Sequence, residues 1–62
     1  MMDRDYYIWK AKHQRGLTDE EINYFLDNYS DWTLLPYYSK HCRAFGAKHA
    51  LELIREEYGE QH

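Results

Sequence analysis

Residues 18–29, TDEEINYFLDNY, carry the clearest structural signal in this chain of 62 residues. Thr18 is a favourable helix N-cap, and Glu21 three residues later completes the pattern of a capping box. Acidic residues 19–21 suit the first turn, because the helix dipole stabilises negative charge there. Apolar side chains then recur at helical spacing and form one stripe, made of Ile22, Phe25, Leu26 and Tyr29. The stretch therefore predicts a helix over 19–29 that is buried along this stripe.

Downstream of this stretch, a connection over 30–35 leads to a longer helical pattern. Pro36 suits the first position of a helix and Gly59 suits its end, so we predict a helix over about 36–58. One face of this helix follows i, i+4, i+7 spacing and consists of Tyr38, Cys42, Phe45, His49 and Leu53, widened by Ala50 and Ile54. We expect Cys42 to be an inert buried thiol on this face, and His49 to lie at the edge of the core.

Gly46 lies in the middle of this predicted helix, where glycine costs about 1 kcal/mol relative to alanine. The neighbouring residues Ala44, Ala47 and Ala50 are also small, which favours close helix packing or a slight kink. The alternative is a true break into two short helices. We expect the helix to continue through Gly46.

Upstream, residues 3–15 predict a first helix that ends before Gly16. Two sides of this helix compete for the core: one has Tyr7, Ile8 and Ala11, and the other has Tyr6, Trp9 and His13. The smaller side fits better against a small core, so we expect Trp9 to face outward.

The whole sequence predicts an all-α fold, a small three-helix bundle with helices at about 3–15, 19–29 and 36–58. Valine is absent and other β-branched residues are few, which disfavours sheets. At 44 % hydrophobic residues the chain is too apolar to be disordered, and its length allows a single helical domain over 1–62. No apolar run approaches the roughly 20 residues of a membrane span, so no membrane role is expected.

Several functional classes are disfavoured by the residues present. Cys42 is the single cysteine, which excludes an internal disulfide, and no Cys or His residues have the paired spacing of a zinc site. We expect no metal and no cofactor. The first residues lack the apolar segment of a secretory signal, which predicts a cytoplasmic protein. So short a chain has little room for a catalytic pocket, and we expect no enzyme.

The leading hypothesis is a non-catalytic regulator or inhibitor that binds another protein, or itself as a homodimer. Seven Tyr, two Trp and two Phe exceed what a small core can hide, and aromatic residues are typical of binding hot spots. The candidate partner-binding residues are Tyr6, Trp9, Lys10, His13 and Tyr24.

The alternative hypothesis is a small nucleic-acid-binding regulator that resembles a helix-turn-helix protein in its arrangement. The net charge of −3 argues against it. Charges nevertheless come in blocks, with +2 over 1–16, −5 over 17–35, +3 over 36–50 and −3 over 51–62. Such blocks favour internal pairing of helices, or a dipolar surface that steers a partner. Candidate nucleic-acid-binding residues in the basic N-terminal segment and the last helix are Lys12, Arg15, Lys40, His41, Arg43 and Lys48.

Overall fold

The computed structural model describes residues 3–59, which form four α-helices and one short 3-10 helix. In chain order the elements are α1 (Arg4–His13), α2 (Asp19–Asn28), η1 (Trp32–Leu34), α3 (Leu35–Phe45) and α4 (Ala47–Tyr58). The prediction of an all-α fold is confirmed, since this described part contains no strand. Residues 1–2 and 60–62 of the predicted single domain lie outside the described residues.

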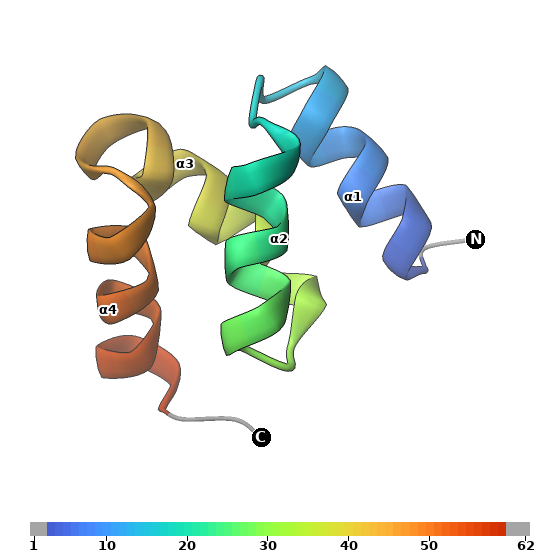
Figure 1. Ribbon diagram of the computed structural model, residues 1–62. Helices are drawn as coiled ribbons and strands as arrows, with labels where there is room; N and C mark the ends of the chain where they lie inside the picture. The colour runs from blue at the N-terminus through green and yellow to red at the C-terminus, as the bar shows by residue number, and fades with distance from the viewer. Residues whose placement is uncertain (1–2, 60–62) are drawn as a thin grey trace.

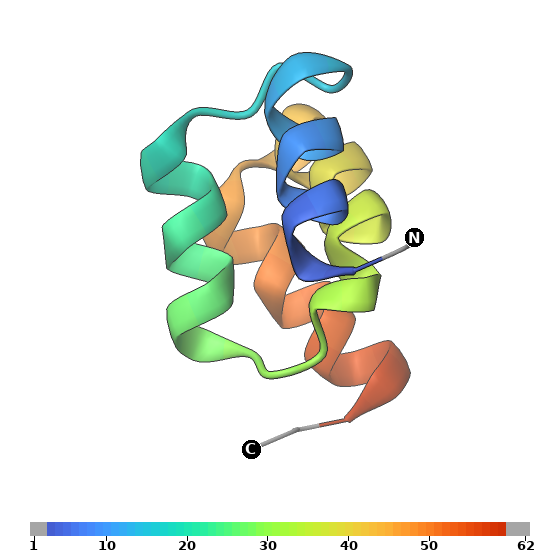
Figure 2. The same ribbon diagram turned by 90° about the vertical axis from the view of Figure 1, so that its right-hand side faces the viewer.

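The helices surround one core, with α2 between α1 and α4 in Figure 1 and α3 passing behind it. Helix α3 packs along α4 and also contacts α1 and η1, whereas α2 contacts α1 and α4. Figure 2 shows the same molecule turned by 90°, with α1 in front of α3 and α2 at one side. No helix over residues 3–59 is long and apolar enough to cross a membrane.

Helix α2 forms as its sequence predicts. The Thr18 hydroxyl accepts a hydrogen bond from the Glu21 amide at 3.1 Å, and the Thr18 amide donates to the Glu21 carboxylate at 2.8 Å. Ile22 and Phe25 are fully buried, and Tyr29, just after the helix, is buried as well. The capping box and the apolar stripe therefore fix where α2 begins and which side it buries.

The core contains side chains from all four helices and from the segments on either side of α2: Ala11, Leu17, Ile22, Phe25, Tyr29, Leu35, Tyr38, Cys42, Ala50, Leu51 and Ile54. At its centre the ring of Phe25 stacks on that of Tyr38, with centroids 4.7 Å apart. Tyr38 donates its hydroxyl hydrogen to the Glu21 carbonyl, and Tyr29 donates to the Gly59 carbonyl, each at 2.7 Å. These bonds satisfy polar groups that burial would otherwise leave unpaired.

Helix α1 is shorter than predicted, because it ends at His13, before the turn at Gly16 with φ +75°. Its orientation is as predicted: Ala11 is buried and Ile8 packs against the core. Trp9 faces outward and is 50 % exposed. The smaller side of α1 thus meets the core, and the larger aromatic side remains at the surface.

The predicted count of three helices is wrong, because Gly46 divides the last helix into α3 and α4. Gly46 has φ +96° and ψ 160°, a conformation that is essentially restricted to glycine. Its amide donates to the Cys42 carbonyl at 2.8 Å, and its carbonyl accepts from the Ala50 amide at 3.0 Å. One residue therefore completes the hydrogen bonds of α3 and begins those of α4.

The single apolar stripe predicted for 36–58 is right only in part. Tyr38 and Cys42 are buried, but Phe45 is 59 % exposed and His49 lies in solvent rather than at the edge of the core. Ala50 and Ile54 are buried as predicted, and Leu51, which the predicted stripe left out, is buried with them. The chain changes direction at Gly46, so helical spacing counted from α3 places His49 on the wrong face.

Candidate functional site

The outward side of α1 brings together four of the five predicted partner-binding residues. The rings of Trp9 and His13, one turn apart, lie 5.3 Å from each other. The ammonium group of Lys10 lies 5.8 Å from the centroid of the Tyr6 ring, within the range of a cation–π contact. We call these four residues (Tyr6, Trp9, Lys10 and His13) the α1 face. It combines aromatic surface with positive charge.

Tyr24, the fifth predicted residue, lies on α2 and is 37 % exposed. Its carbonyl accepts a hydrogen bond from the side chain of Asn28 at 2.7 Å. Among the described residues no ring contact joins Tyr24 to the α1 face. Tyr24 is therefore exposed as expected but separate from the other four.

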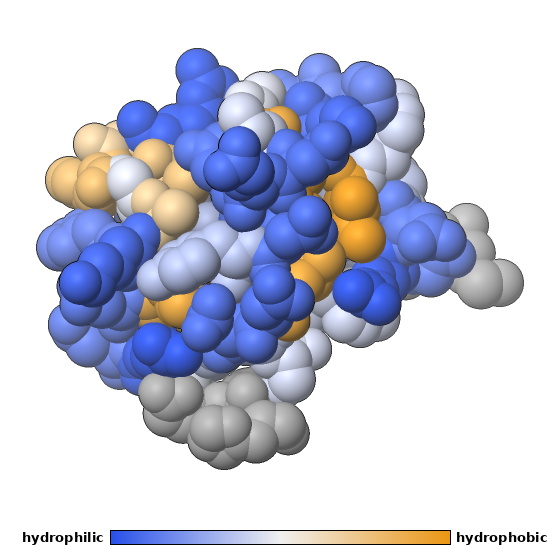
Figure 3. Space-filling view, viewed as in Figure 1, coloured by the Kyte–Doolittle hydropathy of each residue, from blue (hydrophilic) through white to orange (hydrophobic). Residues whose placement is uncertain are grey.

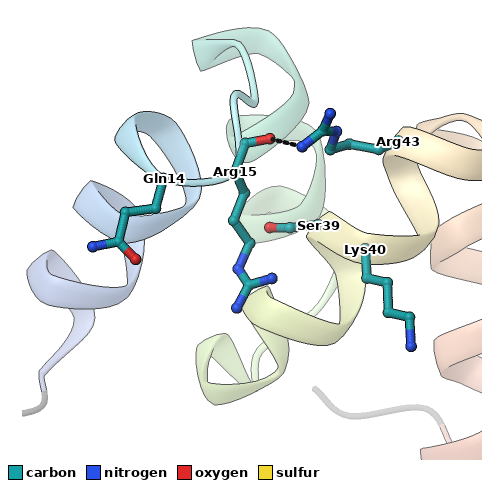
Figure 4. Close-up of a pocket in the computed structure, with 5 residues that line it drawn as sticks. All are labelled: Gln14, Arg15, Ser39, Lys40 and Arg43. Carbon is teal, nitrogen blue, oxygen red and sulfur yellow. Dashed lines mark hydrogen bonds between the residues drawn. The ribbon is translucent and has the colours of Figure 1, made fainter.

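A second feature is a cavity of about 290 Å³ beside the C-terminal end of α1, where α1 meets α3 (Figure 4). It is lined by Gln14, Arg15, Ser39, Lys40 and Arg43. The Arg43 guanidinium donates to the Arg15 carbonyl at 3.3 Å, which ties the chain after α1 to α3. We call this cavity the cationic pocket, because its lining holds three cations and no acid.

The residues of the nucleic-acid hypothesis are only partly brought together. Arg15, Lys40 and Arg43 meet in the cationic pocket, although they come from two separate basic blocks. The other three lie apart. Lys12 forms an ion pair with Asp19 at 3.0 Å, the His41 ring lies 4.3 Å from that of Tyr37, and Lys48 follows the turn at Gly46 on α4. Sequence reasoning missed Gln14 and Ser39, which have no distinctive pattern of their own.

An aromatic and imidazole stripe, also missed, runs along the outside of α3 and α4. Neighbouring rings have centroids 4.3–6.2 Å apart in the order Tyr58, Tyr37, His41, Phe45 and His49. Phe45 and Tyr58 are exposed. Figure 3 shows a pale orange area over the turn between α3 and α4. Spacing of four residues links Tyr37, His41, Phe45 and His49, whereas the contact of Tyr58 with Tyr37 depends on the packing of α4 against α3.

Cys42 belongs to a small buried group that spans α2 and α3. Its thiol donates a hydrogen bond to the Glu21 carboxylate at 3.3 Å. Burial raises the pKa of the Cys42 thiol, and the nearby Glu21 carboxylate raises this pKa further. The thiol therefore stays neutral near pH 7 and is a weak nucleophile. This environment fits the predicted inert thiol and contributes to packing rather than chemistry.

No convergent group of three or more His, Cys, Asp or Glu side chains suited to a metal ion occurs within residues 3–59. No protein-family model, curated protein or solved structure matches this chain. The α1 face and the cationic pocket are therefore the two candidate functional features of the described residues.

Proposed function

We propose that this protein is a non-catalytic regulator that binds another protein through the α1 face. The observation that carries the proposal is the half-exposed Trp9, on the side of α1 opposite the buried Ala11. The fold does not use this indole to fill its core. Tryptophan is the kind of residue that dominates binding energy when a partner covers it.

The charge of the α1 face favours an acidic partner surface. Lys10 lies beside Trp9 in the sequence and contacts the Tyr6 ring. Residues 1–16 together have a net charge of +2. A local positive charge on an acidic chain orients the encounter with a negatively charged patch. The partner that fits is a protein with acidic side chains around an apolar depression able to receive an indole.

A symmetric homodimer fits this face less well. In a two-fold interface the same patch meets itself, so the Lys10 ammonium groups of both copies would lie in one interface. Like charges brought close together in an interface are unfavourable. A distinct acidic partner avoids this repulsion.

The nucleic-acid hypothesis is the weaker candidate. Non-specific binding to a phosphate backbone depends on cations that remain free to contact successive phosphates. Lys12 is already paired with Asp19, and α2 presents further acidic residues beside it. The cations that do converge form a pocket of limited volume rather than a continuous surface.

The test is a binding measurement with matched variants. A partner is captured from the native host after nuclease treatment and purified, and its affinity is then measured by calorimetry. Trp9→Ala is expected to weaken binding by roughly 30-fold, which corresponds to about 2 kcal/mol. The matched control is Tyr24→Ala, an exposed aromatic outside the α1 face, which should change the affinity by less than about threefold.

Trp9 fluorescence and the oligomeric state of the protein test the proposal further. In a Trp32→Phe background, Trp9 emission of the free protein should be red-shifted and accessible to a quencher. Equal affinities of wild type and Trp9→Ala would refute the α1 face as the docking surface. Sedimentation at micromolar concentration that shows a dimer dissolved by Trp9→Ala would identify a second copy as the occupant instead.

A further inference from the structure

We propose that the cationic pocket binds a phosphate monoester group, held by the Arg15 guanidinium group and the Lys40 ammonium group, with Arg43 adding to the positive charge of the lining. This inference goes beyond the proposed docking function and does not depend on it. The lining residues belong to the end of α1, the turn after it and α3, whereas the α1 face consists of other residues on the outward side of α1.

The pocket is held in shape by contacts within the fold. Arg43 reaches across from α3 to the carbonyl of Arg15, so the two segments that carry the cations are fixed relative to each other. Ser39 is fully buried between them and forms part of the wall. Its hydroxyl donates to the Leu35 carbonyl at 2.7 Å, so that hydrogen is not offered to a ligand. Figure 4 shows the Arg15 and Lys40 side chains extending the same way from the two sides of Ser39, whereas the Arg43 guanidinium turns to the Arg15 carbonyl.

The charge of the pocket selects the class of ligand. Arg15, Lys40 and Arg43 give the lining a formal charge of +3, with no carboxylate to balance it, in a chain whose net charge is −3. A monocarboxylate would leave most of this charge uncompensated. A phosphate monoester carries nearly two negative charges at pH 7 and three acceptor oxygens, which suits a guanidinium group beside an ammonium group.

An unpaired donor adds independent support for an acceptor at this place. The Nε atom of Arg15 is buried and has no hydrogen-bond acceptor among the described residues. Buried donors in proteins are normally paired, with protein groups, ordered water or a ligand. Arg15 lines the pocket, and arginine forms strong charge-assisted bonds with oxyanions.

The size of the pocket favours a small ligand over a polymer. Pockets for drug-sized molecules start at about 300 Å³, so a cavity of about 290 Å³ suits a phosphate group and the first atoms attached to it. A nucleic-acid backbone offers one charge per phosphate and needs cations along its length. The monoester can belong to a free metabolite or to a phosphorylated side chain, and both present the same group.

The experiment follows the 15N-labelled protein by NMR during titration with phenyl phosphate, inorganic phosphate and acetate at constant ionic strength. The signals to follow are the Arg15 side-chain Nε–H and the backbone amides of Ser39 and Arg43. Phenyl phosphate and inorganic phosphate should give saturable shifts confined to the pocket, and acetate should bind at least roughly tenfold more weakly. Phosphoserine and a phosphoserine-containing peptide, titrated next, distinguish a free small ligand from a phosphorylated chain.

Two variants inside the pocket and one control outside it test whether the pocket cations bind the phosphate group. Arg15→Gln and Lys40→Gln should each weaken phenyl phosphate binding by roughly tenfold or more, because each removes a charge-assisted bond. Lys40 is exposed, so Lys40→Gln is expected to fold normally and keeps the test valid even if Arg15→Gln does not fold. Lys48→Gln makes the same charge change outside the pocket and should leave the affinity within about twofold.

Three results would overturn the proposal. The first is a set of linear, unsaturated shifts spread over all the lysines and arginines. The second is an equal loss of affinity in Lys48→Gln and Lys40→Gln. The third is saturable binding of a DNA duplex that competes with phenyl phosphate and is weakened by Lys48→Gln, which would assign the cations to a nucleic-acid surface.

Discussion

Helix α2 and the α3–α4 pair use their aromatic residues in opposite ways. In α2, Phe25 is fully buried and stacks on the ring of Tyr38. At the end of α3, Phe45 is 59 % exposed and contacts the rings of His41 and His49. The side chain is the same in both places. The difference shows that the direction of the backbone, as much as hydrophobicity, decides which aromatic residues enter the core.

The aromatic residues differ in burial because α2 is one continuous helix, whereas α3 and α4 are joined by a turn. Helix α2 is a single segment between α1 and α4, and its buried stripe keeps one direction from the capping box at Thr18 to Tyr29. The α3–α4 pair turns at Gly46, so its two helices cover each other and leave an outer stripe of rings uncovered. The contrast predicts different responses to substitution in the two regions.

The largest expected effect comes from truncating the two phenylalanines. Phe25→Ala should destabilise the protein by about 3–5 kcal/mol, because it leaves a cavity in the core. Phe45→Ala should change stability by less than about 0.5 kcal/mol, because its ring is mostly in solvent. Urea unfolding followed by circular dichroism measures both. Similar losses for the two variants would contradict the opposite placement of these rings.

The next effect tests the turn directly. Gly46→Ala should destabilise the protein by about 1–3 kcal/mol, because φ +96° is unfavourable for alanine. The loss comes from the backbone alone, since a Cβ atom at Gly46 would meet nothing within 4 Å. In an unbroken helix the same change would instead stabilise by about 1 kcal/mol. The sign of the change in melting temperature therefore decides between a break and a continuous helix.

A smaller effect is expected at the start of α2. Thr18→Ala removes the side-chain acceptor of the Glu21 amide and should cost about 1 kcal/mol in unfolding free energy. Ser30→Ala is the control, since Ser30 is exposed and lies outside the helices. If both variants melt at the wild-type temperature, the capping box contributes nothing measurable to the stability of α2.

The smallest effect is a pH dependence of the same cap. The hydrogen bond from the Thr18 backbone holds the pKa of Glu21 below its ordinary value of 4.5. The ionised form thus stabilises the fold above about pH 4.5, and this contribution is lost as the pH falls through the lowered pKa. Wild type should therefore lose more stability than Glu21→Gln between pH 6 and pH 3. Glu20→Gln, melted in parallel, is the control. If wild type and Glu21→Gln lose the same stability, ionisation of Glu21 does not contribute to the loss of stability in acid.

These regions also differ in what their sequences reveal. The signals that place α2 are local: a cap, three acids and one stripe within a dozen residues. The break at Gly46 has no such local signal, because the alanines around it suit a helix on either side. Whether the chain turns or only kinks at Gly46 depends on the packing of α3 against α4, which the local sequence does not reveal.

The two candidate sites also differ in whether the local sequence or the packing between helices determines them. The exposure of Trp9 could be predicted from the two sides of one helix, since the choice depends on side-chain size within one element. The cationic pocket could not, because Arg15 and Lys40 are 25 positions apart and meet through the packing of α1 on α3. Their basic character was evident from the sequence, but Gln14 and Ser39 had no signal that linked them to it.

The turn at Gly46 also has a consequence for the rate of folding. Gly46 is the single residue between the two helices, so bringing α3 and α4 together requires almost no loop-closure entropy. Contacts that are close in sequence form quickly, and chains rich in them reach the native state fast. We expect the α3–α4 hairpin to assemble early and to serve as the template on which α2 and then α1 dock. A single glycine would thus set the order of assembly as well as the final shape.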